Sequence, residues 1–365
     1  MKILIVANDD AGLYQFRREL ICELLKKHDV YISLPYGKLV ENLKEDGCKY
    51  IETRVDRRGI NPVTDLFLFL KYLKIITKLK PDLVITYTIK PNIYAGLSSR
   101  LLKIPYAINI TGLGTAFEKD SLLKKLVILM YKVSCKDAKV VFFENEENKQ
   151  IFIDESIIDK SQAFRLNGAG VNLEKFKLLD YPKENKTIFL FMGRIMAEKG
   201  VNELFEATKR LVDNGTNCEL DVLGYYEEDY ENKIKKYENE GWLKYYGYQS
   251  DVRPFIEKCH CFVLPSWHEG MANTNLECAA SGRPVITSNI FGCKEAVEDS
   301  VTGYLTEKKN SESLYNAMKK FTMLSYNEKL KMGYAGRKRM EKVFDKNKVV
   351  QQTIKVLREK GVTDA

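Results

Sequence analysis

Two cationic side chains follow a predicted strand near the middle of the chain. Residues 193–200 read Gly-Arg-Ile-Met-Ala-Glu-Lys-Gly and come directly after the apolar run Thr187–Met192. Gly193 permits a tight exit from the strand, and the charged groups of Arg194 and Lys199 can converge on a diphosphate beside the N-terminus of the following helix. The same string is also typical of a solvated turn with two surface cations, so by itself it leaves both interpretations open.

A second segment places two carboxylates after another predicted strand. A short apolar run enters a loop that contains Glu269 and Gly270, and we expect a helix to begin near Asn273 or Thr274. The free backbone N–H groups of its first turn suit a phosphate. Glu277, which we place in that first turn, can accept two hydrogen bonds from a vicinal diol such as a ribose, and Glu269 can reach other hydroxyls.

These motifs resemble those of the family 4 glycosyltransferases, which are retaining enzymes of the GT-B fold that use nucleotide-sugar donors. The matching elements are the string 193–200 and the pair Glu269 and Glu277, followed by residues 279–286, in the order and spacing of the family. The resemblance extends from the first strand to about Gly303. It implies an α/β chain with two Rossmann-like domains that face a central cleft.

The resemblance assigns roles by position. Arg194 and Lys199 would hold the donor diphosphate and stabilise charge on the leaving phosphate, Glu277 would hold the ribose, and Glu269 would contact hydroxyls of the transferred sugar. The expected catalytic residues are therefore Arg194, Lys199 and Glu269. The expected donor-binding residues are Gly12, Gly193, Arg194, Lys199, Gly270, Met271, Asn273, Thr274, Asn275, Leu276 and Glu277.

The remaining donor contacts follow from the same resemblance. We expect the base of the nucleotide, most simply uracil, near Tyr246–Gln249. Two fixed cations and a helix terminus can supply the electrostatic stabilisation that a metal ion supplies elsewhere, so we expect neither a metal ion nor another cofactor. The co-substrate would be a UDP-linked sugar.

The chain departs from many relatives in its histidines. Its three histidines are His28, His260 and His268, and none follows the first-domain strand where many relatives place one near the transferred sugar. Thr111 and Gly112 stand at that place and could present backbone groups to donor or acceptor. His268 is a further candidate contact to the donor. In this respect the chain is closer to bacterial lipid-linked oligosaccharide, capsule and O-antigen transferases, some of which carry Gly-Leu-Gly at this point.

The loop after the first strand contains two carboxylates. Asp9 and Asp10 precede Gly12, which would let a helix N-terminus approach the diphosphate. One of the two carboxylates could orient an acceptor hydroxyl as a base. An N-cap in an ordinary turn explains them equally well.

Composition and patterning indicate what positions these residues. With 365 residues, 45% hydrophobic and 30% charged, the chain is long enough for two globular domains. Alternating apolar runs and amphipathic stretches predict parallel sheets with crossover helices. The predicted strands are Lys2–Ala7, Val30–Leu34, Leu83–Thr86, Tyr106–Ile110, Val140–Glu144, Thr187–Met192, Cys218–Leu223, Cys261–Leu264 and Pro284–Thr287, with amphipathic helices including Phe16–Lys27, Asn61–Leu79 and Asn92–Leu102.

The restart of this pattern after residue 186 predicts the domain organisation. We expect an acceptor-binding domain at 1–175 and a nucleotide-sugar-binding domain at 176–343. The segment 344–365 is expected to form a helix that returns to the first domain, as in relatives. The eight cysteines are scattered rather than spaced as a disulfide framework, which indicates a reducing, cytoplasmic compartment.

Two basic amphipathic stretches bear on the acceptor. Pro62–Lys80 and Leu122–Lys139 each interleave apolar residues with lysines, and the net charge of +8 lies mostly in the first half of the chain. Such helices can lie on an anionic bilayer surface, although a core-facing helix with a solvated face has the same pattern. With Arg54, Arg57 and Arg58, which could meet a lipid diphosphate, they favour a polyprenyl-diphosphate-linked saccharide as acceptor and no nucleic acid.

The sequence therefore predicts a retaining glycosyltransferase that moves a hexose or N-acetylhexosamine to a lipid-linked saccharide, on the inner face of the plasma membrane. One alternative is a nucleotide-sugar 2-epimerase of the same fold. Another is a catalytically silent subunit docked on the membrane. Cys259-His260-Cys261 also matches part of a zinc site, but alternating cysteines on a strand are more typical of a core.

Overall fold

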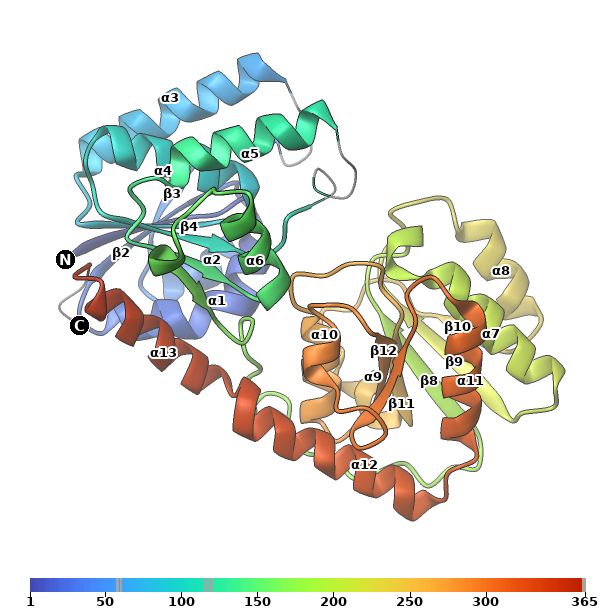
Figure 1. Cartoon of the computed structure of the whole chain (residues 1–365). Coiled ribbons are helices and arrows are strands. Elements are labelled where there is room, and N and C mark those ends of the chain that lie inside the picture. Colours follow the sequence, from blue (N-terminus) through green and yellow to red (C-terminus); the bar gives the residue numbers. More distant parts are fainter. Residues whose placement is uncertain (57–58, 60, 115–116, 118–120, 363–365) are drawn as a thin grey trace. The chain divides into compact units, whose positions relative to one another are not determined.

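The computed structural model describes residues 1–56, 59, 61–114, 117 and 121–362. Arg57 and Arg58, two of the arginines expected near a lipid diphosphate, lie outside these residues. The chain divides into two compact units (Figure 1). Unit 1 comprises Met1–Ala169 and Lys346–Ala365, and unit 2 comprises Gly170–Asp345.

Unit 1 is built on a parallel sheet. In its described part, seven strands lie in the order β3-β2-β1-β4-β5-β6-β7. The strands are β1 (Lys2–Val6), β2 (Asp29–Leu34), β3 (Lys49–Glu52), β4 (Leu83–Tyr87), β5 (Tyr106–Ile110), β6 (Val140–Phe143) and β7 (Ala163–Arg165). The helices are α1 (Asp10–Leu25), α2 (Val40–Glu45), α3 (Pro62–Leu79), α4 (Ile89–Leu101), α5 (Leu122–Cys135), α6 (Glu146–Asp154) and α13 (Lys346–Glu359).

Alternate residues of the central strands face two separate cores. Ile3 and Ile5 of β1 pack in a cluster with α1 and α13, whereas Leu4 and Val6 pack in a cluster with α3, α4 and α5. Because successive side chains of a strand point to opposite faces, the two sets of helices cover opposite faces of the sheet. The α13 helix is held there by apolar contacts and by Lys346, whose Nζ lies 3.3 Å from Glu19 Oε2.

Unit 2 repeats the plan. Its described part holds six parallel strands in the order β10-β9-β8-β11-β12-β13. The strands are β8 (Thr187–Met192), β9 (Cys218–Leu223), β10 (Leu243–Tyr245), β11 (Cys261–Leu264), β12 (Val285–Ser288) and β13 (Gly303–Thr306). The helices are α7 (Val201–Asp213), α8 (Glu231–Asn239), α9 (Arg253–Lys258), α10 (Asn273–Ala280), α11 (Ser311–Thr322) and α12 (Tyr326–Arg339).

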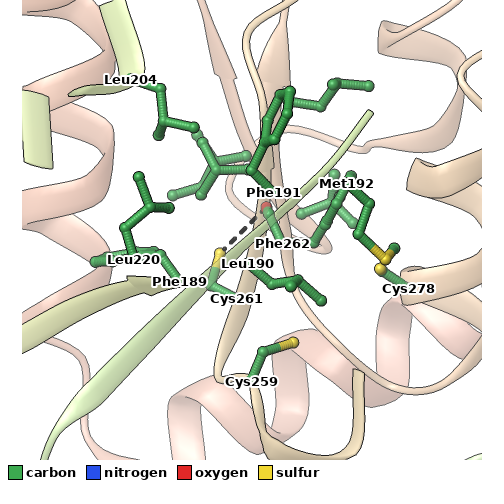
Figure 2. Packing of buried hydrophobic residues seen from close by; sticks show 14 of the residues in the cluster. Phe189, Leu190, Phe191, Met192, Leu204, Leu220, Cys259, Cys261, Phe262 and Cys278 are labelled. Carbon is green, nitrogen blue, oxygen red and sulfur yellow. Dashed lines mark hydrogen bonds between the residues drawn. The ribbon is translucent and has the colours of Figure 1, made fainter. Parts of the chain in front are cut away.

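The core of unit 2 contains aromatic side chains and thiols. Figure 2 shows Phe191 of β8 and Phe262 of β11 among aliphatic side chains, with Cys261 and Cys278 nearby. Burial raises the pKa of the neighbouring Cys259 thiol to about 12, so it stays protonated. All eight cysteines are free thiols.

The predicted strands and the structure differ mainly at sheet edges and helix starts. The long apolar runs form strands as expected, but the four edge strands β3, β7, β10 and β13 are absent from the predicted set. The side chains of β3 and β7 are largely half exposed and give no continuous apolar run, and β10 and β13 contain only three and four residues. The helix predicted from Phe16 begins at Asp10, so that prediction was wrong at its start. None of the described helices is long and apolar enough to cross a membrane.

Candidate functional site

The loop after β8 packs closely against the loop after β11. The loop after β8 contains a short 3-10 turn, Ala197–Lys199, and ends at Gly200. Gly200 is the N-cap of α7 and has a φ of +71°. A Cβ at Gly200 would lie 2.0 Å from the carbonyl oxygen of Pro265. Only glycine permits both the backbone conformation and this approach, so the glycine that closes the predicted motif joins the two loops.

This packing brings Lys199 and Glu269 together. The Lys199 ammonium forms an ion pair with Glu269 Oε1, which also accepts a hydrogen bond of 2.8 Å from the hydroxyl of Ser266. The two side chains are only 17% and 13% exposed, so the pair is well shielded from water. Two residues separated by seventy positions thus meet, as a shared site requires.

Arg194 lies on the exit from the same strand and is more open. Its side chain is 39% exposed, and Nη1 lies 3.6 Å from Glu227 Oε2. The sequence reasoning missed Glu227, which comes from the loop after β9. The acidic run Glu227-Glu228-Asp229 after that strand was the available signal. Glu228 also accepts a hydrogen bond from the backbone N–H of Ala197, so the β9 loop supports the β8 loop.

The N-terminus of α10 has the features of an anion site. The helix begins at Asn273, its N-cap Ala272 offers no side-chain acceptor, and its first turn contains no acidic residue. The N–H of Asn275 donates to the carbonyl of Ala272 at 3.0 Å, whereas N–H groups at the very start of a helix have no partner within the helix and suit an anion. The helix begins at Asn273, within the expected range. Glu277 is its fifth residue and therefore lies in the second turn, not in the first as predicted. Leu276 is fully buried, so only its backbone can face a ligand.

A second glycine fixes the loop that precedes this helix. Gly292, at φ +85°, accepts a 2.7 Å hydrogen bond from the N–H of Ala272 through its carbonyl. A Cβ there would lie 2.5 Å from the carbonyl oxygen of Glu269. The structure also buries the side-chain oxygens of Asn273 and Asn275 without a hydrogen-bond partner among the described residues. Met271 is buried beside them, and Thr274 and Gly270 are partly exposed.

His268 lies beside a glutamate of the loop after β8. Its Nε2 lies 3.5 Å from Glu198 Oε2, and the adjacent Trp267 N–H donates to the Glu198 carbonyl at 2.9 Å. The histidine therefore lies at the β8 loop, close to the predicted site, while its contact to a donor stays a prediction.

The loop expected to hold the base lies beside the diphosphate motif. The N–H of Gly224, which follows β9, donates to the carbonyl of Gly247 at 2.9 Å. A Cβ at Gly224 would lie 1.8 Å from the carbonyl oxygen of Gly193. The loops after β8, β9 and β10 are therefore in contact, which brings residues 246–249 to the same edge of the sheet as Arg194.

In unit 1 the predicted carboxylates already have structural partners. Asp9 caps α1 by accepting a 2.6 Å hydrogen bond from the N–H of Gly12, and Asp10 Oδ2 accepts one of 2.8 Å from the N–H of Leu39. These contacts match the N-cap interpretation. A catalytic role for either aspartate stays a prediction.

Further residues of unit 1 gather at the carboxyl ends of its strands. Thr111 and Gly112 follow β5, and Asn109 at the end of that strand donates to the carbonyl of Thr86 at 3.2 Å. Thr88, after β4, has φ +72° and ψ 162°, a conformation that costs a non-glycine residue about 1–3 kcal/mol. This strained residue could not be predicted from its type, because threonine is ordinary at an N-cap.

A buried ion pair lies near the same edge. Glu144, directly after β6, contacts Arg17 of α1, whose guanidinium lies 5.0 Å from the centroid of the Tyr87 ring. Burial raises the pKa of Glu144, and the positive charge of Arg17 opposes this shift. Neither residue was predicted from the sequence.

Among the described residues, no group of three or more His, Cys, Asp or Glu side chains is arranged so that it could hold a metal ion. The His260 ring is instead part of the fold. Its Nδ1 accepts a hydrogen bond of 3.1 Å from the N–H of Ile188.

Two family models match the chain. The model described as glycosyl transferases group 1 matches residues 176–339, which contain all the unit 2 residues discussed above. The model described as glycosyl transferase 4-like matches residues 2–145.

Two curated relatives are similar over most of their length. The N,N'-diacetylbacillosaminyl-diphospho-undecaprenol alpha-1,3-N-acetylgalactosaminyltransferase of Campylobacter jejuni is 27% identical, with 98% of each chain covered. The UDP-Gal:alpha-D-GlcNAc-diphosphoundecaprenol alpha-1,3-galactosyltransferase of Escherichia coli is 28% identical, with 79% of this chain and 80% of the relative covered.

Solved structures share the fold. Anabaena Alr3699/HepE in complex with UDP and glucose has a TM-score of 0.81 at 16% identity, covering 98% of this chain and 99% of the other. A glycosyltransferase from Rickettsia africae has a TM-score of 0.78 at 20% identity, covering 100% and 99%. The two family models match most of the chain, and the two parallel Rossmann-like sheets are shared with these solved structures. The chain therefore belongs to the group 1, or family 4, glycosyltransferases of the GT-B fold.

Proposed function

We propose that this enzyme transfers a hexose or N-acetylhexosamine, with retention of configuration, from a UDP-linked sugar to a polyprenyl-diphosphate-linked saccharide. One observation carries the donor part of the proposal. Within unit 2, Arg194, Lys199, Glu269 and the uncapped N-terminus of α10 gather at the carboxyl edge of one sheet. Ligands of open parallel sheets bind at that edge.

The donor diphosphate would bind to the cationic side of this site. Arg194 and Lys199 would contact its oxygens, together with N–H groups of residues 273–276. Glu277 would accept hydrogen bonds from the ribose hydroxyls. Glu269 would face hydroxyls of the transferred sugar, and Lys199 would then lie between a carboxylate and a phosphate. The uracil would lie near Tyr246–Gln249, where the β10 loop joins the β8 and β9 loops.

The chemical step needs stabilisation of a leaving group. The bond between the anomeric carbon and the diphosphate oxygen breaks, and its electron pair stays on the diphosphate. The acceptor hydroxyl oxygen bonds to the same face of that carbon, and its proton passes to a leaving phosphate oxygen. Fixed cations and backbone N–H groups aimed at the phosphate lower the barrier because the negative charge develops there.

The acceptor assignment is supported by the relatives. Two of them, from Campylobacter jejuni and Escherichia coli, are named for diphosphoundecaprenol-linked saccharides. We therefore place the reaction at the cytoplasmic face of the plasma membrane, in the assembly of a surface polysaccharide or glycan. The eight free cysteines suit a reducing compartment. Thr111 and Gly112 of unit 1 are the residues that we assign to the acceptor or sugar side.

A thermal-shift panel of nucleoside diphosphates and their sugars tests the donor site. A ligand that binds only the folded protein stabilises it by about 2.7 kcal/mol at about 100 times its Kd. We expect uridine compounds alone to raise the midpoint of unfolding, and Glu277→Ala to remove that rise. Glu206→Ala, an exposed glutamate on α7, is the matched control and should keep it. Equal shifts for all nucleotides would contradict the assignment of uracil, and an undiminished shift in Glu277→Ala would contradict the assignment of the ribose contact.

A transfer assay tests the reaction. The protein is incubated with a UDP-sugar panel and a short-chain polyprenyl-diphosphate-linked saccharide, and the new linkage is analysed by NMR. An α-linked product from an α-linked donor supports the proposal. Inversion would overturn the retaining step, and interconversion of free UDP-sugars without transfer would show an epimerase instead.

A further inference from the structure

Helix α3 exposes a stripe of apolar side chains. Its inner face buries Leu68, Tyr72, Ile75 and Ile76 against the sheet. Val63, Leu66, Phe67 and Leu70 are exposed instead, and Phe67 is 67% exposed. A helix that only covers a core keeps its outer face polar, so this helix departs from the pattern of a simple core-facing helix.

Helix α5 does the same. It buries Val127, Ile128 and Tyr131, and it exposes residues three or four positions apart along its outer side, where they form one stripe. The stripe consists of Leu122, which is 86% exposed, with Leu126, Leu129 and Val133.

The two stripes lie on the same side of unit 1. Both helices cover the same face of the sheet, and α4 contacts each of them. Most residues in the middle of α4 are buried, and several of them are small, such as Ala95, Gly96 and Ser98. Their small size lets α3 and α5 lie beside α4 (Figure 1). We call the exposed residues of α3 and α5 the α3/α5 face.

Lysines extend both stripes. On α3, Lys71 and Lys74 are exposed four residues after Phe67 and Leu70, and Lys78 continues the row. On α5, Lys125 and Lys132 are exposed beside the leucines. Within these two fully described helices the one acidic residue is Asp65, whose carboxylate is held by Lys90 and Tyr94.

A hollow next to α3 adds Arg54, whose Nε lies 3.6 Å from Glu52 Oε1. It is lined by Glu52, Arg54, Thr64, Phe67, Leu68 and Lys71, so basic side chains flank an exposed aromatic ring. Exposed apolar side chains of unit 2 are different, because they are mostly tyrosines scattered over several elements. A contiguous apolar patch with a basic rim marks an interaction surface, whereas single exposed residues do not.

We propose that the α3/α5 face docks on an anionic lipid bilayer. The apolar stripes would enter the acyl boundary, and the lysines would meet the headgroup phosphates. A second copy of the chain is the weaker fit, because it would bring the same lysines against one another. The inference deepens the proposed function and rests on it for the choice of a lipid partner, since a lipid-linked acceptor lies in such a bilayer.

Vesicle co-sedimentation of the full-length protein tests the docking. The probe is vesicles of equal parts phosphatidylcholine and phosphatidylglycerol, with no glycolipid acceptor, and phosphatidylcholine vesicles serve as the neutral comparison. We expect binding to the anionic vesicles. Replacing Lys71, Lys74 and Lys78 by Gln should lower the partition coefficient by about fivefold per lysine. Replacing Leu66, Phe67 and Leu70 by Ser should lower it at least about tenfold.

Matched variants of unit 2 control for composition. Met323→Ser with Val301→Ser and Tyr334→Ser removes equally exposed apolar groups, and Lys235→Gln with Lys236→Gln and Lys331→Gln removes equal charge. Both sets should bind as the unmodified protein does. All substituted side chains are exposed, and an unchanged unfolding midpoint and UDP shift verify that each variant is folded.

Three results would overturn the docking. The first is that the protein does not bind anionic vesicles. The second is that the unit 2 control variants lose as much vesicle binding as the α3 variants do. The third is a dimer in sedimentation equilibrium that dissociates when Leu66, Phe67 and Leu70 are replaced. Because the vesicles carry no acceptor, each leaves the UDP shift and the transfer assay intact, so failure of the docking is distinguishable from failure of the proposed function.

Discussion

In unit 2, carboxylates of the carboxyl-edge loops pair with cationic side chains of the loop after β8, whereas the two aspartates after β1 of unit 1 accept hydrogen bonds from backbone N–H groups. In unit 2, Lys199 reaches Glu269 from another loop, and Arg194 reaches Glu227. In unit 1, Asp9 caps its own helix and Asp10 holds a neighbouring turn. Their outer surfaces differ as well, since exposed aliphatic stripes occur on α3 and α5.

Under the proposed function, one architecture would serve two kinds of ligand. A parallel sheet with crossover helices brings strand-end loops together in either unit. In unit 2 these loops offer two cations and a helix N-terminus without a side-chain cap, which suit a small, highly charged donor. In unit 1 the distinctive chemistry lies on the helices, which suits an amphiphilic partner. The following predictions test this division, beginning with the largest expected effect.

Within unit 2, the division between site and scaffold predicts that Arg283 supports the fold. It belongs to the same motif as Glu269, yet it precedes β12 and is fully buried. Its guanidinium donates to backbone carbonyls, including that of Ile256 at 2.8 Å and that of Asp180 at 2.8 Å. Arg283→Met should lower the free energy of unfolding by about 3–5 kcal/mol, measured by urea denaturation.

Arg253→Met is the control for this prediction. Arg253 is a half-exposed arginine of unit 2 that pairs with Asp251 at the surface, and its loss should cost at most about 1 kcal/mol. If Arg283→Met kept its stability but lost donor binding, Arg283 would belong to the site and the division within unit 2 would be wrong.

The cations of the carboxyl edge should affect catalysis while the variants stay folded, although Lys199→Ala also removes the ion-pair partner of Glu269 and should lower stability. Arg194→Ala and Lys199→Ala should each lower kcat/KM by about 10²–10³, equivalent to about 3–4 kcal/mol of barrier, because each removes a group aimed at the leaving phosphate. Steady-state transfer kinetics measure this. Lys235→Ala, on the surface of α8, should have no effect. Two folded variants with near full activity would show that the charged loops of unit 2 are not the donor site.

Buried carboxylates offer a sharper contrast between the units. Glu144 of unit 1 contacts Arg17, but Asp221 of β9 leaves Oδ1 without a partner among the described residues. Burial, followed by the negative charge of Glu219, raises the pKa of Asp221 from 3.8 to about 6, although Lys244 and Lys186 oppose it.

The raised pKa of Asp221 makes the free energy of unfolding fall as the pH rises. Because the folded protein binds the proton more tightly, the contribution of Asp221 to stability is greatest below pH 3.8 and is lost as the pH rises through about 6. Asp221→Asn should therefore gain stability over the unmodified protein by about 1–2 kcal/mol between pH ~4 and pH ~7. Urea denaturation across this range measures it, with the exposed Asp154→Asn of unit 1 as control. If the difference in unfolding free energy between Asp221→Asn and the unmodified protein did not change with pH, the pKa of Asp221 would not be raised by folding.

The smallest effect separates the two interpretations of Asp9. Asparagine caps a helix as well as aspartate does, so Asp9→Asn should leave both stability and transfer unchanged, while Asp9→Ala should cost about 1 kcal/mol of stability. Thermal unfolding and transfer kinetics of both variants measure this. A large loss of transfer in the stable Asn variant would make Asp9 an acceptor base and give unit 1 a catalytic carboxylate.

Much of the fold was accessible from the sequence because buried parallel strands are short, continuous apolar runs. Thr187–Met192, Cys218–Leu223 and Cys261–Leu264 form strands with the predicted bounds. The donor motif was also local, since Arg194 and Lys199 stand directly after one strand and Glu269 after another. Edge strands such as β3 escaped because a half-exposed strand has no such run.

What only the tertiary structure decided is which residues share a site and which hold the fold. Sequence spacing could not show that Lys199 pairs with Glu269, that Glu227 approaches Arg194, or that Arg283 is consumed by backbone carbonyls. Nor could helical periodicity tell which apolar side chains of α3 are buried and which are exposed. The physical reason is that periodicity and propensity are set within a segment, whereas burial and ion pairing are set by neighbours distant in sequence.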